Sequence, residues 1–129
     1  MSSIEQYNKI ITGFSSLQEA QAWLLSLGAQ VPLHPGLRVK QNYVRGCQSF
    51  VWVDGTVTDN CCKFRLDSDS LIAKGICKIL MDCFNELSTQ QVLAINFQQF
   101  STVAKTLSVQ RQRGLQALIN KIHNIAKNS

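Results

Sequence analysis

The hydrophobic period changes along this chain of 129 residues, and the change limits the folds that it can adopt. Apolar side chains recur every three or four positions over residues 4–27 and again from Ile72 onward, which is typical of helices that bury one face. Between these stretches, residues 49–66 are rich in aromatic and branched side chains and partly alternate, which favours strands. The sequence therefore predicts an α+β fold, in which a small antiparallel sheet is covered by helices.

Capping signals indicate where the predicted helices begin and end. A serine followed three positions later by glutamate or glutamine can satisfy free amides at a helix start. Gly28 is placed to end the second of two N-terminal helices, because glycine is common at helix C-termini. The expected starts are Ser16 with Glu19, Ser68 or Asp69, Ser88 with Gln91, and Ser108.

Two turn signals divide the strand-like segment. Asp54-Gly55 is typical of a tight hairpin turn, and Asp59-Asn60 offers a second turn a few residues later. Together they predict a small antiparallel meander. Residues 29–41 hold both prolines and form a loop. No long polar linker marks a second domain, so residues 1–129 are expected to form a single domain.

Charge and hydropathy narrow the classes of function. The polar start of the chain and the lack of a run of about 18 apolar residues predict a cytoplasmic protein outside the membrane. The net charge is +5, and basic residues spread along 111–127 could steer an acidic partner. Aromatic residues do not interleave with the basic ones, so we expect a protein partner and no nucleic acid.

The chain has five cysteines, which is an odd number, and its start does not resemble an export signal. Both observations predict reduced thiols and no disulfide framework. Cys47 follows Gly46 directly before the strand segment, where a partner could reach it, and Arg45 would favour its thiolate. From spacing alone this signal is weak, and an inert small residue at a turn is the favoured interpretation. Of the adjacent Cys61 and Cys62, alternation places one in the core and leaves the other exposed. We expect structural roles for Cys77 and Cys83.

No motif indicates a metal or a phosphate site. Structural zinc sites usually show paired C-x-x-C ligands, which are missing here, and His34 and His123 are expected in a loop and on a surface. The chain has no glycine-rich phosphate loop and no serine-hydrolase or metalloprotease motif. The acidic cluster from Asp67 to Asp69 is interpreted as helix capping.

Three segments together resemble the SufE family, which includes CsdE. Residues 44–52, Val-Arg-Gly-Cys-Gln-Ser-Phe-Val-Trp, resemble its V-x-G-C-x-S-x-V-W signature. Residues 67–75 are similar to its D-S-D-x-x-I-x-K-G segment, and residues 111–118 to its R-x-x-G-L-x-A-L segment. The order and spacing agree, and the resemblance covers nearly the whole chain. One departure is Gln110, where many members have serine.

The resemblance implies a fold shared with IscU-type scaffold proteins and a role in supplying sulfur for iron–sulfur cluster assembly. Cys47 would accept persulfide sulfur from a cysteine desulfurase of the Suf or Csd type, stimulate that enzyme, and pass the sulfur to a scaffold or another recipient. The chain itself would need no metal and no cofactor, because the pyridoxal phosphate belongs to the desulfurase. The chain would transfer sulfur only as one member of a pair. The resemblance implies supporting roles for Arg45, Gly46 and Arg111, and partner contacts for Asp67, Asp69 and Lys74.

Two alternatives remain open at this point. An IscU-like scaffold would need Cys47 to converge with Cys61, Cys62 or Cys77 on iron. A redox-regulated binding module would instead use the adjacent Cys61 and Cys62.

Overall fold

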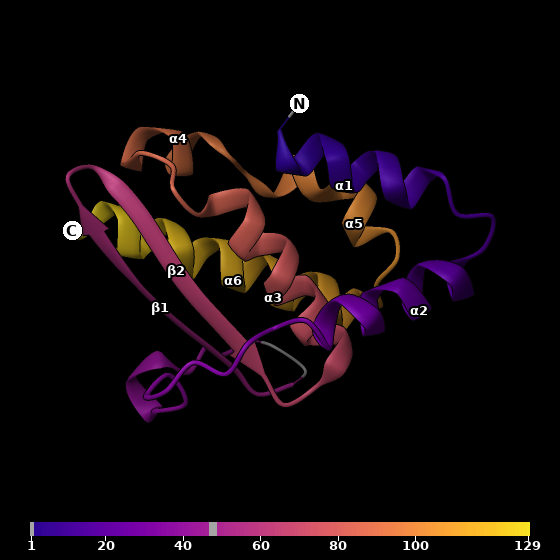
Figure 1. The fold of residues 1–129 in the computed structure, drawn as a ribbon, viewed down its shortest axis with the longest axis horizontal. Coiled ribbons are helices and arrows are strands. Elements are labelled where there is room, and N and C mark those ends of the chain that lie inside the picture. The colour runs from indigo at the N-terminus through magenta and orange to yellow at the C-terminus, as the bar shows by residue number, and fades with distance from the viewer. Residues whose placement is uncertain (1, 47–48) are drawn as a thin grey trace.

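The computed structural model describes residues 2–46 and 49–129, and the order of its elements is visible in Figure 1. The prediction of an α+β fold with a small antiparallel sheet is confirmed. The α-helices are α1 (Ser3–Thr12), α2 (Leu17–Gly28), α3 (Leu71–Phe84), α4 (Thr89–Ala94), α5 (Ser101–Ala104) and α6 (Val109–Lys127). The 3₁₀ turns are η1 (Lys40–Asn42) and η2 (Phe97–Phe100), and the strands are β1 (Val51–Thr58) and β2 (Cys61–Ser68).

The sheet of the described residues is one long hairpin, so the expected turn at Asp54-Gly55 is wrong. The strands pair from Val51 opposite Ser68 to Thr58 opposite Cys61. The turn lies at Asp59-Asn60, whose positive φ angles of 52° and 58° match the primed turns that suit twisted hairpins. The extra pairing on the other edge of β1 is an isolated bridge between Tyr43 and Trp52.

Gly55 is required in the strand for packing rather than for a turn. A Cβ at this position would lie 2.6 Å from the Phe64 ring on the opposite strand and 3.0 Å from Ile125 of α6. Glycine within a strand often marks such a close approach. The glycine of the Asp-Gly pair is therefore explained by the close packing of the hairpin against α6, and not by a turn of the chain.

One face of the hairpin is buried under helices. Side chains at alternate positions point into the core, including Val53 on β1 with Phe64 and Leu66 on β2. Helix α3 packs against β2, and α6 packs against β1. The loop after α2 lies outside the hairpin, where Arg65 of β2 donates a hydrogen bond to the Pro35 carbonyl. Because side chains alternate between the two faces of the hairpin, one face packs against helices and the other is covered by the loop after α2.

Two glycines allow α2 and α3 to pack closely. A Cβ on Gly28 would lie 2.2 Å from the Leu71 carbonyl oxygen, and one on Gly75 would lie 2.3 Å from the Leu24 carbonyl oxygen. Real Cβ atoms do not approach oxygen so closely, so neither position accepts a larger residue without a shift of the helices. Gly28 is the last residue of α2, as expected, but this contact is a second reason for the glycine.

The capping signals are mostly confirmed. Ser88 and Gln91 form the expected reciprocal capping box, and Ser108 caps α6. Ser16 caps α2, but the Glu19 carboxylate accepts hydrogen bonds from Ser15 rather than from the Ser16 amide. The expected cap of α3 is wrong. Its N-cap is Ser70, whose amide donates to the Ser68 hydroxyl at 3.2 Å.

Among the described residues, no helix has the length and apolar character needed to cross a membrane.

Candidate functional site

Cys47 and Gln48 lie outside the described residues, so the site is built from the residues on either side of them. Gly46 has a φ of +92°, a conformation that favours glycine. A Cβ there would lie 3.6 Å from the Ala117 Cβ, which places this end of the gap against α6. Ser49, at the other end, lines a small pocket between the hairpin and two helices. The two flanks of position 47 thus meet α6 and the pocket.

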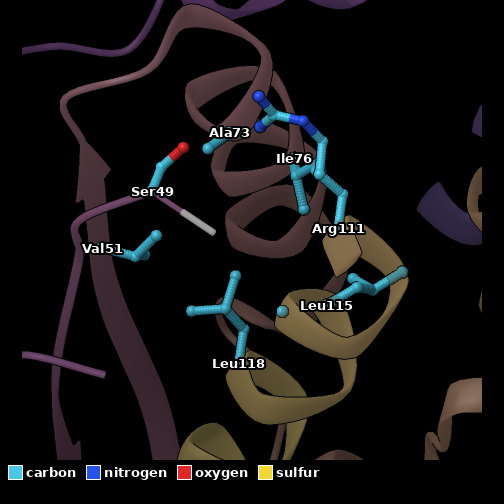
Figure 2. A pocket seen from close by; sticks show the side chains of 8 residues that line it. Ser49, Val51, Ala73, Ile76, Arg111, Leu115 and Leu118 are labelled. Carbon is cyan, nitrogen blue, oxygen red and sulfur yellow. The ribbon is translucent and has the colours of Figure 1, made fainter. Parts of the chain in front are cut away.

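The pocket is apolar apart from two side chains. Its volume is about 20 Å³, which is space for roughly one water-sized group. Figure 2 shows Ser49 from the segment before β1, and the other lining side chains from β1, α3 and α6. A group inside would contact mostly apolar walls and would remain partly open to solvent. The polar lining residues are Ser49 and Arg111, and the others are Val51, Ala73, Ile76, Gly114, Leu115 and Leu118.

Arg111 supplies the positive charge of this pocket. It lies in the first turn of α6, where its backbone amide donates to the Ser108 hydroxyl at 3.2 Å. In Figure 2 its side chain extends from α6 toward Ala73 on α3. The ion pairs between described residues do not include Arg111. Its charge is therefore available to an anion at the pocket, such as a thiolate.

The backbone on both sides of position 47 is held by hydrogen bonds. The Val44 amide donates to the Val51 carbonyl at 2.9 Å. The Phe50 carbonyl accepts from the Ser68 hydroxyl at 2.7 Å and from the Asp69 amide at 3.2 Å. The backbone at residues 44 and 50 is therefore fixed relative to the sheet.

A second network ties the outer loop to the same end of the hairpin. The Arg38 Nε donates to Asp67 at 2.8 Å, and its Nη2 donates to the Ser68 carbonyl at 3.1 Å. The Arg38 guanidinium also lies 4.9 Å from the centre of the Trp52 ring, which allows a cation–π contact. Lys74 of α3 approaches the same carboxylate at 3.7 Å. One arginine thereby joins the loop, both strands and the residues that hold Phe50.

Asp67 is a buried, ionised centre of this network. Its side chain is only 4% exposed. Burial alone would raise its pKa, but hydrogen bonds from Arg38 and the Ser68 amide, with the nearby charges of Arg38 and Lys74, outweigh burial and lower the pKa. The carboxylate therefore stays charged at neutral pH and stabilises the fold.

The structure brings together some of the residues that the sequence singled out. Gly46 lies against α6 and Arg111 lines the pocket, whereas the Arg45 side chain is exposed. Asp69 is exposed and Lys74 is half-buried beside Asp67. Contact of Asp67, Asp69 or Lys74 with a partner stays a prediction, and the geometry gives Asp67 a structural role.

Sequence reasoning missed Arg38 and Ser49. Arg38 lies in an irregular loop, and its partner is 29 positions away, so no local pattern connects the two residues. Ser49 is the serine of the signature around Cys47, but the sequence pattern alone assigned it no role at the site. A pocket formed by two helices and a strand is visible only in the folded chain.

The adjacent cysteines lie at the opposite end of the hairpin. Cys61 is the first residue of β2 and lies beside the turn. The other end of the ladder, nearer to position 47, is the pair of Val51 and Ser68. Seven strand residues at about 3.4 Å each separate the two ends by about 24 Å. Cys62 is buried as expected, and Cys61 is half-exposed.

Burial makes two of the remaining thiols poor nucleophiles. Burial, followed by the neighbouring Cys61, raises the pKa of Cys62. Burial and then Asp82 raise the pKa of Cys83 to about 12. Thiols with raised pKa values hold little thiolate at neutral pH. Cys83 and Cys77 are buried, in agreement with the structural roles expected for them.

Neither histidine joins a metal site among the described residues. His123 is half-buried, and its Nε2 lies 2.7 Å from the Ile95 carbonyl oxygen. His34 lies in the loop after α2, as expected. The described residues include no group of three histidine, cysteine, aspartate or glutamate side chains that could hold a metal ion.

Comparison with known proteins identifies the family. A family model described as "SufE: Fe-S metabolism associated domain" matches residues 7–126. The chain belongs to the SufE family. This match covers the flanks of position 47, the Asp67 network and Arg111 within one SufE domain, and it associates the chain with iron–sulfur metabolism.

The SufE fold also matches a solved structure over almost its whole length. The solution structure of a hypothetical protein from Thermus thermophilus superposes with a TM-score of 0.80 at 18% identity. The match covers 99% of this chain and 97% of that protein. At this identity the likeness supports the fold alone.

Proposed function

We propose that this SufE-family protein accepts sulfur on Cys47 from the persulfide of a cysteine desulfurase, stimulates that enzyme, and passes the sulfur on for iron–sulfur cluster assembly. The partner would be a pyridoxal-phosphate enzyme of the Suf or Csd type. The recipient would be a cluster scaffold or another sulfur acceptor. Because reduced thiols are required, the proposed location is the cytoplasm.

The observation that carries the proposal is the small apolar pocket beside the flanks of position 47. Ser49 lines it, Gly46 lies against α6, and Arg111 brings a positive charge that no described carboxylate neutralises. Apolar walls would partly shield a bound sulfur from water and reductants, and a cation favours the thiolate form of a nearby cysteine. The pocket combines these two requirements of a sulfur carrier.

The proposed transfer is a thiol exchange that needs no external oxidant or reductant. The Cys47 thiolate attacks the terminal sulfur of the desulfurase persulfide, and a new sulfur–sulfur bond forms on Cys47. The bond between the two sulfurs on the desulfurase breaks, and the desulfurase cysteine leaves as a thiolate. The proton of the terminal sulfur remains on it throughout. Arg111 would stabilise the negative charge before attack and again when Cys47 becomes the leaving group for the next acceptor.

The scaffold alternative receives less support from the geometry. By the rise per strand residue, Cys61 lies about 24 Å and Cys62 about 20 Å along the hairpin from the Val51–Ser68 end, which is next to the flanks of position 47. An iron cluster needs ligands within a few ångströms of each other, so this separation from the flanks disfavours a shared cluster. Cys77 is buried on α3, and it would have to bind iron without Cys61 and Cys62.

The proposal can be tested by following sulfur from labelled cysteine. A desulfurase loaded with pyridoxal phosphate and ³⁵S-cysteine is mixed with this protein, and the protein-bound label and desulfurase turnover are measured. We expect label on this protein and faster turnover of the desulfurase. Label that stays on the desulfurase, with unchanged turnover, would contradict the proposal.

A further inference from the structure

The end of the hairpin beside position 47 carries an unusual aromatic surface. Phe50 is 56% exposed and is the one aromatic side chain among the described residues that lies mostly in solvent. Its ring lies 5.5 Å from the Tyr43 ring and 6.2 Å from the Trp52 ring. We call these three residues the aromatic shelf. Single exposed apolar side chains are common, but a partly exposed cluster of three neighbouring rings is the kind of contiguous apolar surface that marks a site of protein–protein interaction.

The aromatic shelf is held rigidly by the rest of the site. The Phe50 carbonyl accepts hydrogen bonds from β2 and the start of α3, and Tyr43 bridges to Trp52 in the sheet. The Arg38 guanidinium lies over the Trp52 ring, 4.9 Å from the centre of that ring. Aromatic residues and arginine are the side chains most enriched where protein partners bind tightly, and little side-chain entropy is lost when they are held in advance.

The charge around the aromatic shelf is positive. Lys40 and Arg45 have exposed side chains within a few positions of Tyr43, and the two cations Arg38 and Lys74 share the single carboxylate of Asp67, which leaves a net positive charge there. The carboxylates on the same side are largely neutralised, since Asp54 pairs with Arg65 and Asp67 pairs with Arg38. Asp69 is the exposed carboxylate near Phe50 among the described residues. A complementary partner would be apolar at its centre and acidic at its rim.

We propose that the aromatic shelf is the docking surface for the cysteine desulfurase, and that Phe50 enters an apolar pocket on that enzyme whose rim carries carboxylates. This inference rests on the proposed function, and its support is the position of Phe50, three residues from the acceptor cysteine. Sulfur exchange requires the two reacting sulfurs to touch, so the partner must cover this end of the hairpin. The shelf offers the anchor, and the lysine and arginines select an acidic rim.

The experiment compares Phe50→Ala with Leu93→Ala, a matched removal of an exposed apolar side chain on α4. Binding of each full-length variant to a pyridoxal-phosphate-loaded desulfurase is titrated, and sulfur transfer is then measured at saturating desulfurase. We expect Phe50→Ala to raise Kd at least about tenfold, which corresponds to about 1.4 kcal/mol. Its transfer rate at saturation should stay within about twofold of the wild type, and Leu93→Ala should leave Kd unchanged.

A second pair of variants tests the charge of the rim without touching the aromatic rings. Lys40→Glu should raise Kd and weaken the dependence of binding on salt, because attraction to an acidic rim is lost. Lys127→Glu, at the exposed end of α6, makes the same charge change elsewhere and should have little effect. Thermal melts of all four variants check that each one folds.

The outcomes separate the two proposals. If the wild type accepts sulfur but Phe50→Ala and Lys40→Glu bind as tightly as their controls, the docking surface lies elsewhere and the inference fails, while the proposed function stands. If the wild type neither binds the desulfurase nor accepts sulfur, both fail. Self-association of the isolated protein that Phe50→Ala abolishes would assign the shelf to a second copy of this chain and would also overturn the inference.

Discussion

The two ends of the hairpin carry cysteines in opposite surroundings. At the end near position 47, the strands meet an apolar pocket whose arginine pairs with no described carboxylate, and hydrogen bonds hold the flanking backbone. At the turn end, in Figure 1 near α4 and the C-terminus, Cys61 and Cys62 belong to a regular ladder. If the proposed function holds, this difference predicts that the reactivity of a thiol depends on the chemistry of its surroundings and not on the number of thiols nearby.

Among the changes that test this contrast between the two ends of the hairpin, loss of the pocket charge should have the largest effect on sulfur uptake. Replacing Arg111 with methionine keeps much of its apolar length but removes the cation that favours the thiolate. We expect the rate of sulfur uptake to fall roughly 10- to 100-fold, which is less than the roughly 100- to 1,000-fold loss seen when a donor is removed from an oxyanion hole, because Arg111 is half-exposed. Arg111→Lys should recover part of the rate. Arg113→Met, on the exposed face of α6, is the matched control.

An Arg111→Met variant that accepts sulfur at the wild-type rate would show that the pocket charge has no role in the transfer. A loss of equal size in Arg113→Met would point to the general charge of α6 instead.

The buried carboxylate should matter more for stability than the partly exposed one. Asp67→Asn removes the charge that pairs with Arg38 and Lys74, and should lower the free energy of unfolding by about 1–3 kcal/mol. This is less than for a fully buried pair, because Arg38 is partly exposed. Asp54→Asn breaks a partly exposed pair with Arg65 and should cost about 1 kcal/mol or less. Urea unfolding at pH 7 measures both, and equal losses would contradict the network.

The same carboxylate predicts a dependence of stability on pH. Because its pKa in the folded protein lies below the ordinary value of 3.8, Asp67 contributes stability above that value and loses it as pH falls through the folded pKa. Wild type should therefore lose stability on acidification below about pH 4 faster than Asp67→Asn. Parallel pH profiles for the two proteins would contradict this assignment.

Burial should also order the reactivity of the other thiols. In a Cys47→Ser background, the half-exposed Cys61 should react with an alkylating reagent first. Cys62 and Cys83 should react at least about tenfold more slowly, because burial raises the pKa of both and limits access. Time-resolved peptide mapping distinguishes these sites, and equal rates would indicate that the core opens readily.

The smallest expected effect belongs to the turn end. Cys61→Ser should leave sulfur uptake from the desulfurase within about twofold of the wild type, since about 24 Å of strand separates Cys61 from the flanks of position 47. A large loss of uptake in Cys61→Ser would remove the contrast between the two ends and revive a role for this thiol.

The sequence predicted the elements whose signals are local. The helix caps at Ser88 and Ser108 and the apolar faces of α1, α2, α3 and α6 follow from short-range patterns, and the structure confirms them. The sequence predicts turns at both Asp54-Gly55 and Asp59-Asn60, and only the second one forms. At the first, packing decided otherwise, since Gly55 must fit between Phe64 and Ile125.

The candidate site was predictable only in part. Gly46 and Arg111 belong to motifs that the sequence shows, whereas Arg38 acts through a carboxylate 29 positions away. The pocket combines side chains from β1, α3 and α6, and its lining depends on how those elements pack. Long-range pairings of this kind leave no periodic or capping signal in a single sequence.

The most direct test of the account is intact-mass analysis of the protein after reaction with a cysteine desulfurase and cysteine. Wild type, Cys47→Ser and Cys61→Ser are compared, and peptide mapping locates any added sulfur. The account predicts a gain of about one sulfur atom, roughly 32 Da, on Cys47 in the wild type and in Cys61→Ser, and no gain in Cys47→Ser. An undiminished gain in Cys47→Ser, or sulfur found on Cys61, would contradict the central claim.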